Sequence, residues 1–135
     1  MTDEDPIATF QSYLDISPFQ RWLAIKAKEV SEGHLVTSIE WKEDFVSNPQ
    51  TNSIHGGILA ALIDLGGLYA VLSTKSVATA TVDLRGDYHR PASSGQIKAT
   101  SGVIKLGSKV STAETRITNP EGKLIASGRG VYLMA

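Results

Sequence analysis

The hydrophobic and polar positions along the chain divide it into one long apolar segment and several alternating ones. Residues 53–73 are apolar on nearly every helical face and carry a single charge, Asp64. A helix that is hydrophobic all round is normally buried, and an unpaired carboxylate within it is costly. We expect a central buried helix that starts near His55 or Gly56, with Ser53 as its N-cap. Asp64 then needs a reason to be there.

Alternating hydrophobic positions predict strands on both sides of this helix. Two strands are expected before it and four after it, at residues 24–30, 35–42, 77–89, 95–106, 109–118 and 123–133. The last four are joined by short connections and form an antiparallel meander. Strands that run together instead of alternating with helices indicate the α+β class. We expect a six-stranded sheet that curves around the single helix.

The N-terminal segment differs from the rest of the chain. Apolar residues at helical spacing from Ile7 to Leu14 predict a short amphipathic helix, which Pro18 ends. Residues 19–23 are expected to form an apolar turn. We therefore predict one domain over residues 1–135, in which residues 1–18 are an arm or lid.

The strand after the central helix is a candidate interface. Its alternation places Val82, Leu84 and Tyr88 on one face and Thr81 with Asp83 on the other. A long edge strand with unpaired backbone groups invites pairing with a second copy of the chain. A homodimer is the expected assembly.

Composition narrows the possible functions. The 135 residues suffice for one core without disulfides or metal, and the net charge is −1 with both signs interspersed. This balance argues against nucleic acid or an acidic membrane surface as partner. The absence of cysteine excludes a thiol nucleophile and cysteine-zinc sites. Residues 1–5 are unlike a signal peptide, and Asp64 interrupts the one stretch of membrane-spanning length. A cytoplasmic protein is expected.

Spacing separates the two chemically interesting parts of the helix. His55 and Asp64 are nine residues apart, so they lie roughly 180° apart around the axis and ~13 Å apart along it. They cannot meet in one site within one helix. A shared site would need two antiparallel helices related by a two-fold axis.

The start of the helix is suited to a developing negative charge. Glycines at positions 56 and 57 leave the first backbone N–H groups uncovered, and the helix dipole adds to their effect, as in an oxyanion hole. An ionised Asp64 placed opposite could attack an activated acyl carbon or deprotonate a water. Both alternatives are compatible with the residues.

The combined pattern resembles a known family. His-Gly-Gly at 55–57, an acid nine residues after the histidine, and the Asp-Leu-Arg strand at 83–85 are similar to the hotdog-fold acyl-CoA thioesterases of the phenylacetate-pathway type. The resemblance implies a sheet wrapped around a central helix, and dimers that often assemble into a homotetramer. It implies hydrolysis of acyl-CoA without a separate cofactor, since CoA is part of the substrate, and without metal.

The resemblance also implies roles for individual residues. Asp64 would be the nucleophile or general base and would come from the partner subunit. The Gly56 N–H would polarise the thioester carbonyl, and His55 would help position it. The Thr81 hydroxyl would help to hold water. The family asparagine falls on Asn48 only if the loop holds one extra residue, and Asn52 competes for this role.

The CoA contacts and the rival functions stay open at this point. Candidates for binding the substrate are Gly57, the basic residue Arg90, and the turn residues Ser108 and Lys109. Lys105 and Arg129 are further basic residues that could meet the phosphates of CoA. A hotdog domain that binds acyl-CoA without hydrolysing it is one rival. A hotdog hydratase or dehydratase is the other, but it would need an Asp/His pair in one site, which the nine-residue spacing disfavours within one subunit.

Overall fold

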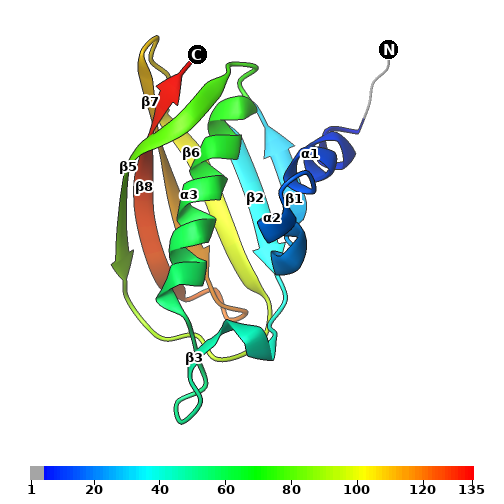
Figure 1. Cartoon of the computed structure of the whole chain (residues 1–135), viewed down its shortest axis with the longest axis vertical. Coiled ribbons are helices and arrows are strands. Elements are labelled where there is room, and N and C mark those ends of the chain that lie inside the picture. The colour runs from blue at the N-terminus through cyan, green and yellow to red at the C-terminus, as the bar shows by residue number, and fades with distance from the viewer. Residues whose placement is uncertain (1–4) are drawn as a thin grey trace.

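The long apolar segment forms helix α3 (Gly56–Leu72), and a sheet of six antiparallel strands curves around it (Figure 1). The structure is a computed structural model that describes residues 5–135, so the first four residues of the predicted arm lie outside it. The buried central helix is confirmed. The predicted N-cap is wrong, because the side chain of His55 caps α3 while Ser53 lies in the short strand β4 (Ser53–Ile54).

The sheet has the spatial order β1-β2-β6-β7-β8-β5. Its strands are β1 (Lys26–Ser31), β2 (His34–Ile39), β5 (Ala78–Tyr88), β6 (Ile97–Lys105), β7 (Val110–Thr118) and β8 (Leu124–Met134). This confirms the predicted six-stranded α+β fold. The meander, however, comprises only β6, β7 and β8. The chain between β5 and β6 passes the N-terminal end of α3 (Figure 1), so β5 pairs with β8 at the far edge of the sheet.

Strand β5 is irregular where it faces the middle of α3. Its pairing with β8 shifts register between Thr81 and Asp83. Such a bulge reverses the alternation of side chains, and it turns Thr81 toward α3. Tyr88 also contacts α3, so the prediction that Thr81 and Tyr88 lie on opposite faces is wrong.

Two short helices precede the sheet. They are α1 (Pro6–Leu14) and α2 (Pro18–Leu23). Ser17 caps α2 and Pro18 occupies its first position, where the missing N–H of proline costs nothing. The segment expected as a turn is therefore helical. Helix α1 packs over β1, at the edge opposite β5, and buries Phe10 and Leu14 there (Figure 1).

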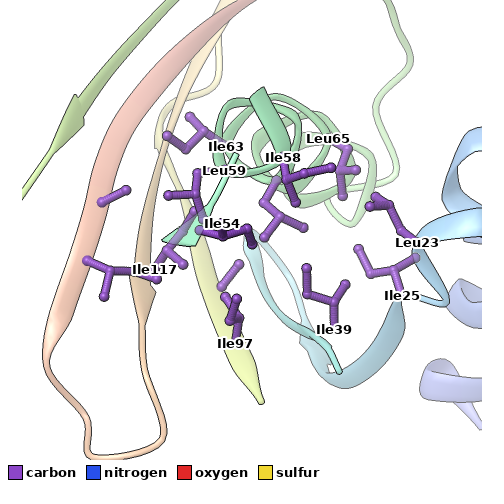
Figure 2. Close-up of a cluster of buried hydrophobic side chains, with 14 of the residues drawn as sticks. Leu23, Ile25, Ile39, Ile54, Ile58, Leu59, Ile63, Leu65, Ile97 and Ile117 are labelled. Atoms are coloured by element: carbon purple, nitrogen blue, oxygen red, sulfur yellow. The ribbon is translucent and has the colours of Figure 1, made fainter. Parts of the chain in front are cut away.

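The core lies between α3 and the concave face of the sheet. Figure 2 shows Ile58, Leu59 and Ile63 of α3 in one cluster with Ile97 and Ile117 of the sheet, and all five are buried. Between β2 and α3 the chain forms a 3-10 turn (Glu43–Phe45) and a small hairpin of β3 (Val46–Asn48) with β4. The sheet thus holds α3 on one face and leaves the opposite face of the helix available.

Candidate active site

The N-terminal end of α3 leaves one backbone N–H group free. The ring nitrogen Nδ1 of His55 accepts a hydrogen bond from the N–H of Gly57 at 2.8 Å. The N–H of Gly56 has no partner among residues 5–135, as expected for the first amide of a helix. Of the two glycine amides, Gly57 is therefore engaged in capping and Gly56 is available to a ligand.

His55 has a defined role at this helix end. Because Nδ1 accepts a hydrogen bond, the neutral ring carries its proton on Nε2. The side chain is exposed, so the Nε2–H can donate to a bound group. A Cβ on Gly57 would lie against the imidazole ring, which explains the second glycine.

Asp64 lies halfway along α3 and is held by two hydroxyl groups. Thr81 Oγ1 donates to Asp64 Oδ1 at 2.6 Å, and Tyr132 Oη donates to the main-chain oxygen of Asp64 at 2.9 Å. The residue is partly buried, and Asp64 Oδ2 has no hydrogen-bond partner within residues 5–135. One carboxylate oxygen is thus fixed and the other is free for chemistry.

Tyr132 is a structural support of this site that the sequence did not reveal. Its side chain is fully buried, and a Cβ on either Gly67 or Gly130 would overlap its hydroxyl group. Burial raises the pKa of Tyr132 well above its ordinary value, and the negative charge of Asp64 adds to the effect. The hydroxyl therefore stays protonated and can donate to Asp64. The nearest signal in the sequence is the small residue Gly67, which permits this close approach.

The two halves of the candidate site do not meet within one chain. Gly56 and Asp64 are eight residues apart, which corresponds to ~12 Å along α3. Both face the edge strand β5, but at different points. Tyr88 Oη donates to the main-chain oxygen of Gly56 at 3.1 Å, whereas Thr81 contacts Asp64. Seven positions of β5 therefore separate the two contacts.

The CoA-binding candidates fall at opposite ends of the helix. Arg90 and Gly56 line one pocket of about 380 Å³, together with Tyr88 and His89. Ser108 and Lys109 lie in the turn between β6 and β7, near the C-terminal end of α3 (Figure 1). One chain cannot bring Lys109 and Arg90 to the same CoA phosphate group.

Both candidate asparagines serve the loop before α3. Asn48 Oδ1 accepts a hydrogen bond from the N–H of Gln50 at 3.0 Å, as in an Asx turn. Asn52 has a positive φ of 56° and donates from Nδ2 to the main-chain oxygen of Ser93 at 3.4 Å. Within residues 5–135, neither side chain hydrogen-bonds to Asp64 or to the start of α3.

Two further findings apply to all the residues that the structure describes. Over residues 5–135, no helix is both long and apolar enough to span a membrane. In the same range, His, Asp and Glu side chains form no group of three that could hold a metal ion.

Comparison with known proteins identifies the family. Residues 51–126, which include α3 and β5, match the family model of the thioesterase superfamily. The chain therefore belongs to the thioesterase superfamily, and its fold is the hotdog fold.

Three relatives show how far the likeness extends. A solved structure of a thioesterase superfamily protein is 39% identical and superposes with a TM-score of 0.91. The match includes 96% of this chain and 98% of that chain. The medium/long-chain acyl-CoA thioesterase YigI of Salmonella typhimurium is 27% identical over 132 residues, 87% of this chain and 85% of that protein. The PaaI protein of E. coli, 24% identical, shares the fold with a TM-score of 0.85 over 95% of this chain and 91% of that chain.

Proposed function

We propose that the protein hydrolyses acyl-CoA thioesters to a free acid and CoA at a site shared by two subunits. The observation that carries the proposal is the carboxylate of Asp64 in an otherwise apolar helix. One of its oxygens is held by Thr81, and the other has no partner within residues 5–135. Membership of the thioesterase superfamily, and the acyl-CoA thioesterases among the relatives, support this substrate class.

The edge strand supplies the geometry for a shared site. Val82 and Tyr88 of β5 are 59% and 56% exposed, which is unusual for large apolar side chains on an edge. If two copies of β5 pair antiparallel about an axis near Leu84, Thr81 of one lies opposite Tyr88 of the partner subunit. Thr81 is hydrogen-bonded to Asp64, and Tyr88 is hydrogen-bonded to Gly56. This pairing would therefore bring Asp64 close to Gly56 of the partner subunit.

The reaction follows from this arrangement. The free N–H of Gly56 and the dipole of α3 stabilise the thioester oxygen as it becomes negative. Asp64 of the other subunit either attacks the acyl carbon, which gives an anhydride that water then hydrolyses, or removes a proton from a water that attacks this carbon. The thiolate of CoA leaves, and His55 orients the acyl group through Nε2. In this proposal, Thr81 fixes the carboxylate and Arg90 beside Gly56 meets a phosphate of CoA.

Several further properties expected from the sequence remain predictions. They comprise the cytoplasmic location, the assembly of two dimers into a homotetramer, and the absence of a metal or separate cofactor from the reaction. Roles for Asn48, Gly57, Ser108 and Lys109 toward the substrate also stay predictions. Lys109 lies at the C-terminal end of α3, far from Gly56 of the same chain. It could therefore bind CoA only at a site that contains the Gly56 of another subunit.

Replacement of Asp64 by asparagine tests the function. Asn keeps the size of the side chain and accepts from Thr81, but it is neither a base nor an effective nucleophile. We expect release of free thiol from acyl-CoA to fall by about 10²–10⁴-fold in kcat, with binding of acyl-CoA retained. Glu114→Gln, which removes an exposed carboxylate on the convex face, is the matched control. If wild type binds acyl-CoA without cleaving it, or the Asp64→Asn variant is as fast, the proposal is wrong.

A further inference from the structure

An apolar pocket of about 520 Å³ lies where α1 approaches the C-terminal end of α3. Its walls include Tyr13 and Ile16 of the N-terminal arm, Tyr69 and Leu72 of α3, and Val77 before β5. Ile16 is 74% exposed and Val77 is 60% exposed. Large aliphatic side chains gathered around a hollow in this way indicate a site for an apolar group.

Tyr69 is a polar residue of the pocket wall whose hydroxyl is hydrogen-bonded within the chain; Ser17, Lys75 and Ser76 also line the pocket. Tyr69 Oη accepts from Gln20 Nε2 at 3.3 Å and donates to the main-chain oxygen of Tyr13 at 3.5 Å. The tyrosine therefore presents its ring to the pocket and holds the arm in place. A ligand that fills this space gains by burying hydrocarbon more than by hydrogen bonding.

One face of α3 leads from Asp64 to this pocket. Asp64, Leu68 and Leu72 follow one another at intervals of four residues, so they form one row along the helix. All three are partly buried, and Leu72 lines the pocket. Asp64 contacts Thr81 of β5 and Leu72 lines the pocket beside the arm, so the row runs along α3 from the β5 side toward α1. Asp64 and Leu72 are eight residues apart, ~12 Å along the axis.

We infer that this pocket binds the distal end of the acyl chain, and that the protein acts on medium- to long-chain acyl groups. The inference rests on the proposed function, because it places the thioester carbonyl at Asp64. An extended chain of C–C bonds of about 1.5 Å advances about 1.3 Å per carbon, so roughly ten carbons are needed to reach Leu72. A butyryl or phenylacetyl group ends short of the pocket.

A second pocket of about 680 Å³ adjoins the first. Tyr13, Leu72 and Lys75 line both, so the Tyr13 side chain forms part of the partition between them. The arm thereby sets the length of chain that the site accepts. A larger residue in the first pocket shortens the preferred chain, and a smaller residue at position 13 lengthens it.

The test measures kcat/KM for acyl-CoA substrates from four to sixteen carbons, with phenylacetyl-CoA included. Wild type should prefer chains of ten or more carbons. Ile16→Trp fills the pocket, and we expect the ratio of dodecanoyl-CoA to butyryl-CoA activity to fall at least tenfold. Tyr13→Ala should move the optimum toward sixteen carbons. Ile7→Trp introduces the same side chain on the same arm away from both pockets and should leave the profile unchanged.

The outcomes separate this inference from the proposed function. If wild type cleaves no acyl-CoA, the proposed function fails. If it cleaves butyryl-CoA or phenylacetyl-CoA as efficiently as dodecanoyl-CoA, or Ile16→Trp and Tyr13→Ala leave the profile unmoved, the acyl pocket is wrong. Thermal unfolding of each variant identifies any loss of folding. Dodecanoyl-CoA binding to Asp64→Asn, with and without Ile16→Trp, gives a measure that does not depend on turnover.

Discussion

Asp64 combines three properties that rarely coincide in one residue. It is charged, it belongs to an apolar helix, and both its side chain and its main chain accept hydrogen bonds from hydroxyl groups, those of Thr81 and Tyr132. A hydrogen bond to a charged group contributes more than one between neutral groups. The two hydroxyls thus fix the residue in orientation as well as position, which suits a group that must act on a reacting atom.

Tyr132→Phe tests the second of these contacts. The raised pKa of Tyr132 means that the phenol stays neutral in the folded chain above pH 10.0, where the unfolded chain ionises it. The unfolded state then binds fewer protons, so the free energy of unfolding falls as pH rises above 10, by up to about 1.4 kcal/mol per pH unit. We expect the free energy of unfolding, measured in urea, to fall less for the phenylalanine variant than for wild type between pH 9 and pH 11.

The same variant has a functional consequence. If Tyr132 positions Asp64, removal of the hydroxyl should lower kcat for acyl-CoA with little change in KM, because substrate does not touch the phenol. Equal pH dependence of unfolding in wild type and Tyr132→Phe would show that the phenol ionises as freely in the folded chain as in the unfolded one.

Some residues of the candidate site could be predicted and others could not. Asp64 could be predicted because it is the single charged residue in an apolar helical segment, which the sequence shows directly. Gly56 stands out because glycine at a helix start exposes an amide. Tyr132 gives no such signal, since an alternating strand predicts that it points inward but not what its hydroxyl meets. Its partner lies 68 positions earlier in the chain.

The two neighbouring amides at the start of α3 have different roles. His55 accepts a hydrogen bond from the N–H of Gly57, whereas the N–H of Gly56 has no partner in the part of the chain that the structure describes. A serine or aspartate N-cap would also engage an amide in the first turn. The histidine adds a second nitrogen that faces outward. This helix terminus is therefore capped without losing the donor that the proposed reaction requires.

Gly56→Pro removes that donor with little other change. Gly56 is the first residue of α3, where proline is favoured, and His55 has φ −63° and ψ 130°, a conformation that a residue before proline adopts readily. A Cβ at position 56 would lie 3.6 Å from the Tyr88 ring, an ordinary contact. We expect a folded variant with kcat reduced by about 10²–10³-fold, the cost of one oxyanion-hole donor.

Gly56→Ala separates the amide from the side chain. It adds the same Cβ but keeps the N–H, so its loss of activity should be much smaller than that of Gly56→Pro. Circular dichroism and thermal unfolding establish that both variants fold. Equal activities for the proline and alanine variants would mean that the Gly56 amide does not stabilise the transition state.

At the level of elements, hydrophobic periodicity predicted the six strands of the main sheet and helix α3. It did not predict the short helix α2 or the bulge in β5. The six strands of the sheet and α3 follow from alternation and apolar length, because burial enforces those patterns. Helix α2 was missed because six residues hold too little periodicity, and the Ser17-Pro18 start was the only cue. The bulge at Thr81 was also missed, since an extra residue in a strand leaves no trace in composition.

The whole molecule explains why one helix carries two incompatible halves. Within a chain, Gly56 and Asp64 are separated by ~12 Å along α3. In the proposed dimer the separation is an advantage, because each helix would contribute its start to one site and its middle to the other. The order of strands matters here, since it leaves β5 as a free edge on the Asp64 side of α3. The sequence suggested this pairing, but which residues of β5 face the helix emerged only from the fold.

Hybrid dimers test the shared site directly. Subunits with Asp64→Asn and subunits with Gly56→Pro are each inactive alone in this scheme, because every site lacks one group. In a hybrid dimer, the Asp64 of the proline variant meets the Gly56 of the asparagine variant, and one of the two sites is complete. Random exchange makes half of the dimers hybrid, so activity per subunit should recover to about a quarter of wild type. Separately tagged subunits establish by pull-down that hybrids form. If they form without activity while wild type is active, Asp64 and Gly56 do not serve the same thioester, and the edge pairing of β5 must be replaced by an assembly that brings other residues to Asp64.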